Sequence, residues 1–150
     1  MNRLYALALL LTGEHGAAEA CFVAALEDCR TGPEVFRESA QAWSRRAIVK
    51  QAIRRVRPRP EVPGSAASAQ VPRESIASLL FQLTAFDRFV FAMTVLERYS
   101  HKESALLLDC RLTDIEAARK RALQFIAAAG RNAVPPIVTA TQLEAPAAVA

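Results

Sequence analysis

The densest run of residues that could bind a ligand is basic. Between residues 45 and 57 the sequence RRAIVKQAIRRVR holds six Arg or Lys residues and no acidic one. At about 100° per residue, four of the six project within an arc of about 80° on one helix face. These four are Arg46, Lys50, Arg54 and Arg57. Such a stripe can hold a phosphate backbone, and Trp43, one turn earlier on the same side, can stack on an unpaired base.

Two other interpretations of this helix stay open. The stripe can be an ordinary solvated face beside a core tryptophan, and a basic amphipathic helix can also lie on an anionic membrane. The apolar side lacks the bulky Leu, Phe and Trp residues of interfacial helices. It carries Ile48, Val49, Ala52, Ile53 and Val56. The composition therefore favours nucleic acid over membrane.

A second motif lies at residues 100–121, SHKESALLLDCRLTDIEAARKR. Ser100 can cap a helix with Glu103 three residues later, and Thr113 with Glu116 repeats the same spacing. A tight break at residues 109–111 separates the two predicted helices. Two short helices with a brief turn are typical of a helix-turn-helix, whereas the alternative is a helical hairpin in a bundle.

The second helix of this motif divides into two faces at about 100° per residue. The predicted core face holds Ile115, Ala118, Ala122, Leu123 and Ile126. The predicted outward face holds Glu116, Ala117, Lys120, Arg121 and Gln124. Lys120 and Arg121 suit phosphate or guanine contacts, whereas Glu116 repels phosphates.

Catalytic, metal-binding and cofactor-binding motifs are missing from the sequence. It has two isolated histidines, no Gly-rich phosphate loop and no GxSxG motif. Its three cysteines have no CxxC spacing, so we expect neither a zinc site nor a disulfide framework. Cys110 beside Arg111 is either a partly activated thiol or a buried turn residue. We therefore expect no enzyme activity, no catalytic residue, no metal and no cofactor, and a reducing, cytoplasmic location.

The length, hydrophobic content and net charge of the chain limit the class of protein to which it can belong. The chain has 150 residues, 52% of them hydrophobic, which excludes intrinsic disorder. Its net charge of +4 permits nucleic-acid binding without demanding it. The apolar run at residues 4–11 loosely resembles a secretory signal, but it is too short to span a bilayer and has helical spacing. We expect it to be the first helix of a soluble domain, with no membrane contact.

The predicted architecture is all-α, with two small helical domains joined by a Pro-rich flexible linker, the second domain a helix-turn-helix. We expect helices at 3–12, 17–29, 34–41, 43–57, 75–83, 86–98, 101–108 and 114–128. The linker at 58–73, PRPEVPGSAASAQVPR, holds four prolines and no apolar period, so it should be extended. The domains are thus 1–57 and 74–130, followed by a flexible tail at 131–150.

The order of these features resembles a bacterial RNA polymerase sigma factor of the extracytoplasmic-function (ECF) group. Residues 4–19 look like the opening of that family's second conserved region, LYxxALxLTGDxxxAED. Residues 83–122 follow its fourth region, LPxxxRxVFxLxxLExxSxxEIAxxLxCxxxTVKSRxxRA, without a gap. The helix from Trp43 to Arg57 is similar to the one that contacts and melts the minus-ten promoter element in the family.

The resemblance implies a transcription initiation factor that binds core RNA polymerase and promoter DNA, with an anti-sigma or other regulatory protein as a further partner. The DNA contacts that it and the charge pattern predict are Trp43, Arg46, Lys50, Arg54, Arg57, Arg111, Thr113, Lys120 and Arg121. The alternative is a degenerate sigma-like protein that acts as a protein-interaction or regulatory module without promoter recognition. This alternative rests on Ala20, Val23 and Ala24, where the family has polar residues that dock on polymerase, and on Glu116 and Ala118, where it has basic ones.

Overall fold

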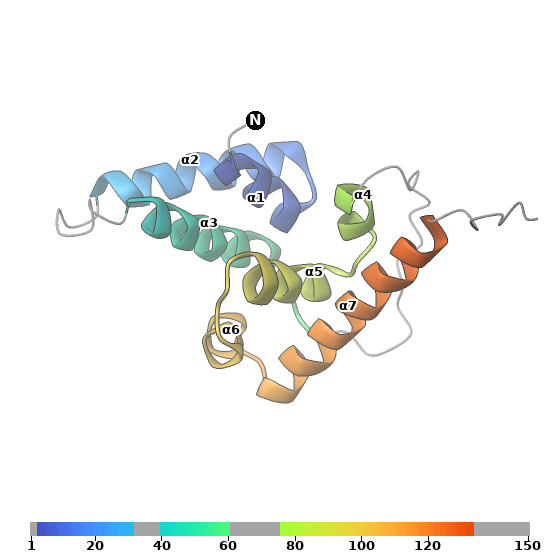
Figure 1. Cartoon of the computed structure of the whole chain (residues 1–150). Helices are drawn as coiled ribbons and strands as arrows, with labels where there is room; N and C mark the ends of the chain where they lie inside the picture. Colours follow the sequence, from blue (N-terminus) through green and yellow to red (C-terminus); the bar gives the residue numbers. More distant parts are fainter. Residues whose placement is uncertain (1–2, 32–39, 61–75, 134–150) are drawn as a thin grey trace, which may run out of the picture.

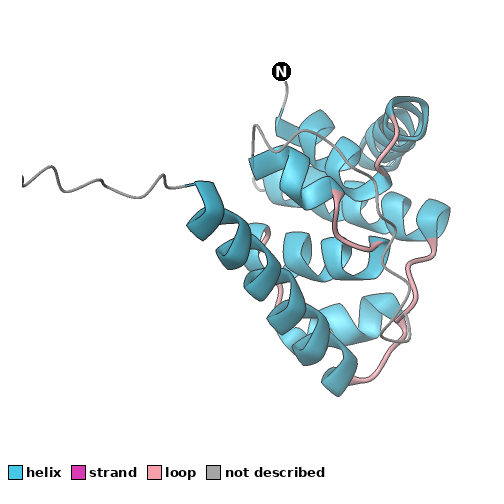
Figure 2. Cartoon of the chain, turned by 90° about the vertical axis from the view of Figure 1, so that its right-hand side faces the viewer, coloured by secondary structure: helices cyan, strands magenta, loops and turns pink. Residues whose placement is uncertain are grey.

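The structure is a computed structural model that describes residues 3–31, 40–60 and 76–133. Within these ranges every regular element is a helix and no strand occurs, which confirms the all-α prediction (Figure 2). The first half of the chain contributes α1 (Arg3–Thr12), α2 (His15–Thr31) and α3 (Ala40–Val56). The second half contributes the elements α4 (Ile76–Phe81), α5 (Ala85–Phe91), the π-helical turn η2 (Ala92–Leu96), α6 (His101–Leu108) and α7 (Leu112–Ala133).

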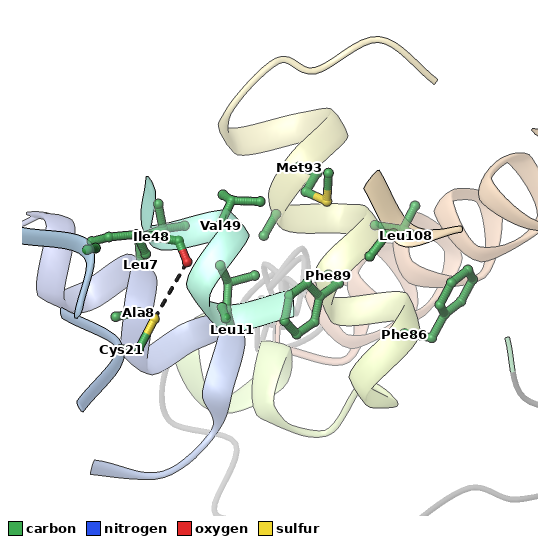
Figure 3. Packing of buried hydrophobic residues seen from close by; sticks show 14 of the residues in the cluster. Leu7, Ala8, Leu11, Cys21, Ile48, Val49, Phe86, Phe89, Met93 and Leu108 are labelled. Carbon is green, nitrogen blue, oxygen red and sulfur yellow. Dashed lines mark hydrogen bonds between the residues drawn. The ribbon is translucent and has the colours of Figure 1, made fainter. Parts of the chain in front are cut away.

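The three helices of the first half pack on one another (Figure 1). The side chains buried between them are small or aliphatic. In α1 the residues Leu7, Ala8 and Leu11 recur at helical spacing and are buried. Gly13 ends α1 with φ of +79°, a left-handed conformation that glycine adopts without steric cost. This sharp turn lets α2 fold back along α1. Cys21 of α2 is fully buried, and its thiol lies 3.5 Å from the Ile48 carbonyl of α3 (Figure 3).

In the second half, side-chain caps fix the helix starts. The Thr84 hydroxyl accepts a hydrogen bond from the Asp87 amide at 3.2 Å and so begins α5. The next helix is predicted at 86–98, but the α-helix stops at Phe91 and continues as η2. There the Glu97 amide donates to the carbonyl of Ala92, five residues back, at 2.9 Å. Hydrophobic spacing does not distinguish this wider turn from an α-helix.

Buried residues of both halves form one hydrophobic cluster (Figure 3). Leu11 and Val49 from the first half belong to the same cluster as Phe89 and Met93 from the second. A smaller cluster of the second half, which includes Leu83 and Ala122, also packs against Leu10 of α1. The predicted arrangement of two separate domains is therefore not confirmed, because the helices of both halves share a core.

Arg88 joins the halves at the end of α1. The side chain is 8% exposed, and its guanidinium donates to the Leu11 carbonyl at 3.4 Å. Positive charge is favourable at this carbonyl end of a helix. The guanidinium carbon also lies 6.0 Å from the centre of the Phe81 ring. Burial lowers the pKa of Arg88 below the ordinary arginine value.

Several predicted helix boundaries are confirmed and others are wrong. The helices at 3–12 and 101–108 begin and end as predicted. The last helix is longer than the predicted 114–128, because it begins at Leu112 and runs to Ala133, into the region predicted as a flexible tail. The predicted helix at 34–41 lies mainly outside the described residues. So do most of the linker and the rest of the tail.

Candidate nucleic-acid interface

The predicted cationic stripe is one exposed face of α3. Arg46, Lys50 and Arg54 recur every four residues and are all exposed. The buried side of the helix consists of Ala47, Ile48, Val49 and Ala52. Ile53 and Val56 are half-buried against the same core. The predicted division of this helix into a cationic and an apolar side is confirmed.

The residues at the two ends of the stripe, Trp43 and Arg57, differ from the middle ones in burial and in backbone conformation. Arg57 was predicted as the last residue of the helix, but α3 ends at Val56 and Arg57 has a left-handed φ of 48°. Its amide donates to the Ile53 carbonyl at 2.8 Å, and its side chain is exposed. Trp43, in the first turn of α3, is half-buried, so only part of its indole faces solvent.

The remaining two basic residues of the run contact neighbouring helices. Arg45 lies 3.7 Å from the Glu97 carboxylate, and Arg55 donates to the Ala20 carbonyl of α2 at 3.1 Å. Gln51, between them, donates to the Asp28 carboxylate at 2.7 Å. These contacts fix the rotation of α3, and that rotation directs the stripe outward.

The predicted helix-turn-helix segment folds as two helices joined by a short turn, α6 and α7. The capping box at Ser100 is confirmed: its hydroxyl accepts from the Glu103 amide at 3.2 Å. The Glu103 carboxylate accepts in return from the Ser100 amide at 2.9 Å. These hydrogen bonds lower the pKa of Glu103 below the ordinary glutamate value. Asp109 ends α6 in a left-handed conformation with φ of 50°.

The predicted second cap, Thr113 with Glu116, is wrong. Because α7 begins at Leu112, Thr113 lies inside the first turn and is exposed there. Arg111 instead precedes the first turn, and the Asp114 carboxylate three residues later accepts from the Arg111 backbone amide at 3.1 Å. The spacing of Thr113 and Glu116 therefore placed the start of this helix two residues too late.

The outward face of α7 is largely as predicted. Ile115, Ala118 and Ala122 are buried, whereas Lys120 and Gln124 are exposed. Leu123 was predicted in the core but is 37% exposed, so the buried stripe is narrower than expected. In Figure 1 α5 lies between α3 and α7, so the two helices do not form a common layer.

Arg121 has an acidic partner that the sequence did not suggest. Its guanidinium makes two hydrogen bonds to the Asp87 carboxylate of α5, at 2.6 and 3.1 Å. Asp87 is 5% exposed. A fork of this geometry is stronger than a single hydrogen bond. Arg121 therefore holds α7 on α5, and in this conformation its charge is compensated within the chain.

A cleft that spacing could not predict opens between the carboxyl ends of α3 and α6. Its volume is about 530 Å³. Arg54, Arg57 and Arg59 line it together with Asp109. The apolar lining residues are Ile53, Pro58, Pro60, Leu107 and Leu108. Arg59 is therefore a further cation beside the predicted stripe.

Other chemistry finds little support in the described parts of the chain. Burial raises the pKa of Cys21. Burial, together with the Asp114 and Asp109 carboxylates, raises the pKa of Cys110. A raised pKa leaves a smaller fraction of the Cys110 side chain as thiolate, so Cys110 is not an activated thiol. No group of three metal-ligating side chains occurs among the described residues. Within the same ranges, every helix is too short or too polar to cross a bilayer.

Comparisons with known proteins do not identify a relative. No family model matches the sequence, and neither a curated protein nor a solved structure matches it.

Proposed function

We propose that this chain is a sigma-like transcription initiation protein that binds core RNA polymerase and promoter DNA. The observation that carries the proposal is the exposed stripe of α3, on which Arg46, Lys50 and Arg54 lie in a row with Arg57 at its end. The resemblance of residues 4–19 and 83–122 to the family supplies the identity of the partners. This function requires no catalytic residue and no cofactor, and it belongs to the cytoplasm.

The stripe matches the charge and the repeat of a nucleic-acid strand. Residues four positions apart on a helix are separated by about 6 Å along its axis. Successive cations can therefore reach successive phosphates of one strand without rearrangement of the helix. Each contact releases condensed counterions, so binding should weaken steeply with salt. The exposed part of Trp43 adds a surface on which an unpaired base can stack.

In this proposal the helix-turn-helix contributes fewer contacts than the sequence suggests. Arg111 and Lys120 are exposed and Thr113 lies in the first turn of α7, where a phosphate can approach. Arg121 can contact DNA only if its hydrogen bonds to the Asp87 carboxylate break. The α3 stripe therefore accounts for most of the binding.

Pull-down with core RNA polymerase tests the proposal directly. Immobilised chain should retain core polymerase, and the retained complex should open a promoter fragment. Double reversal of Lys50→Glu and Arg54→Glu should abolish promoter opening and leave polymerase retention unchanged. A wild-type chain that retains no polymerase refutes the proposed function.

A second function, a regulatory interaction module, is favoured by one group of observations. Arg121 is paired with Asp87, Glu116 is exposed on the outward face of α7, and Leu106 at the nearby end of α6 is 83% exposed. In that case Glu116→Lys should create affinity for duplex DNA where the wild type has none. Strong retardation of duplex DNA by the wild type in a gel shift would eliminate this second function.

A further inference from the structure

The outer face of α2 combines exposed apolar and acidic residues. Val23 and Leu26 are 54% and 47% exposed. Glu19 and Glu27 are exposed on either side of them, and the four residues fall within an arc of about 100°. The opposite side of α2 packs on α1 and α3 through Ala18, Cys21 and Ala25. The outer face is therefore a surface on which burial of the two apolar side chains would be favourable.

The cleft between α3 and α6 has the complementary character. Leu107 lines it and is 40% exposed, with Ile53 and Leu108 beside it. The three arginines described above line the same cleft, so it suits an apolar segment that carries carboxylates. A helix that lays an apolar face into such a groove is a common mode of recognition.

Each surface also carries one charge of the opposite sign, and these two charges can pair with each other. Among the described residues that line the cleft, Asp109 is the only acid, against three arginines. On α2, one turn after Leu26, Arg30 is exposed on the same face as the two glutamates. A helix inserted with its glutamates toward the arginines can thus offer one arginine to the one aspartate. Complementarity in both signs favours this particular pair of surfaces over wrong partners.

We propose that α2 of one copy of this chain occupies the α3–α6 cleft of a second copy. Val23 and Leu26 of one molecule would pack on Leu107 of the other. The two glutamates would pair with the cleft arginines, and Arg30 with Asp109. The outer face of α2 and α6 lie on different sides of the molecule, so one chain cannot make this contact within itself (Figure 1).

Such an interface joins two different surfaces, so an open assembly of any length leaves one α2 face and one cleft unoccupied. Assemblies of this type grow as open chains or close into rings. The mass of the wild-type protein should therefore rise with concentration past that of a dimer. This self-association does not depend on the proposed function, because it requires neither polymerase nor DNA.

Complementary charge reversal tests the contact without touching the core. The first variant carries Glu19→Arg and Glu27→Arg, and the second carries Arg54→Glu, Arg57→Glu and Arg59→Glu. Each variant alone brings like charges together and should stay monomeric in sedimentation velocity. An equal mixture restores opposite charges at both possible contacts and should associate again. The control for the first variant, Glu14→Arg with Glu116→Arg, makes the same change in net charge at exposed sites elsewhere and should associate like the wild type.

Two further measurements sharpen the result. Leu26→Ser should shift assembly to concentrations about tenfold higher, because it removes one buried apolar contact. Circular dichroism of every variant must match the wild type, since all changed side chains lie on the surface. The proposal is overturned if the wild type stays monomeric at every concentration or if the single variants associate as the wild type does. A mixture of the two variants that stays monomeric overturns it as well.

Discussion

The two basic helices, α3 and α7, use their cations differently. On α3 the cations at positions 50 and 54 are exposed to solvent, Arg46 is exposed but near the Glu103 carboxylate, and the polar contacts to other elements are made by Arg45, Gln51 and Arg55. On α7 the predicted ligand contact Arg121 is itself the residue that holds the helix, through Asp87. Helical spacing identifies which residues share a face. It does not identify which of them have a partner on another element.

Because the two helices use their cations differently, charge changes on them should affect ligand binding and folding stability differently. Charge changes on the α3 stripe should affect ligand binding and leave folding almost unchanged, whereas changes at Arg121 or Asp87 should affect both. Four variants test the shared core, the α3 stripe, the Asp87–Arg121 pair and the start of α6.

The largest effect is expected at the core. Phe89 is fully buried in the cluster common to both halves, so Phe89→Ala should lower the free energy of unfolding by about 3–5 kcal/mol. Chemical denaturation followed by circular dichroism should show one transition for the entire chain. Leu106→Ala, at an exposed position, is the control and should change stability by less than about 0.5 kcal/mol. Two separate transitions would show that the halves fold independently.

The next effect concerns the stripe. Lys50→Glu with Arg54→Glu should weaken binding of single-stranded DNA by about 100-fold at low salt, because two attractive contacts become repulsive. Fluorescence anisotropy at several salt concentrations should also show a shallower salt dependence. Arg3→Glu with Lys102→Glu reverses two exposed cations on α1 and α6 and should weaken binding much less. Equal losses in both double variants would show that binding follows net charge alone.

A smaller effect with two readouts is expected at Asp87. Asp87→Asn removes the charge that pairs with Arg121 and should cost about 1–2 kcal/mol of stability, since the half-exposed guanidinium is screened by water. The released Arg121 should at the same time strengthen duplex DNA binding by about threefold. Arg121→Ala in the same background should remove the gain. Unchanged affinity in Asp87→Asn would exclude Arg121 from DNA binding.

The smallest effect concerns the start of α6. Ser100→Ala should cost roughly 0.5–1 kcal/mol, because one side of the capping box is lost. The folded pKa of Glu103 is lowered, so its contribution is present above the ordinary glutamate pKa and disappears as the pH falls through the folded value. The difference between wild type and variant in urea denaturation should therefore shrink in acid. A difference independent of pH would contradict this assignment.

Much of the local structure could be predicted because it depends on neighbouring residues. The capping box at Ser100 needs only residues three apart, and the two faces of α3 follow from the helical repeat. The same reasoning located the exposed stripe and the buried Ile48, Val49 and Ala52. At the start of α7 the prediction of Thr113 as the cap failed, because Arg111 precedes the first turn and its amide donates to the Asp114 carboxylate.

The rest could not be predicted because it depends on residues far apart in the chain. Asp87 and Arg121 are separated by 34 positions, and each of them alone has the appearance of an ordinary surface charge. The proline-rich segment predicted a flexible tether between separate domains. The helices before and after this segment nevertheless bury apolar side chains against each other. The α3–α6 cleft arises only from that packing, so no motif marked Arg59 or Leu107 as neighbours.

The close approach of Arg88 to Gly13 limits how this molecule can change over time. A methyl group at position 13 would lie 3.1 Å from the guanidinium, in a backbone conformation that other residues rarely adopt. Position 13 therefore tolerates a side chain poorly for two reasons, its left-handed backbone and the nearby Arg88 guanidinium.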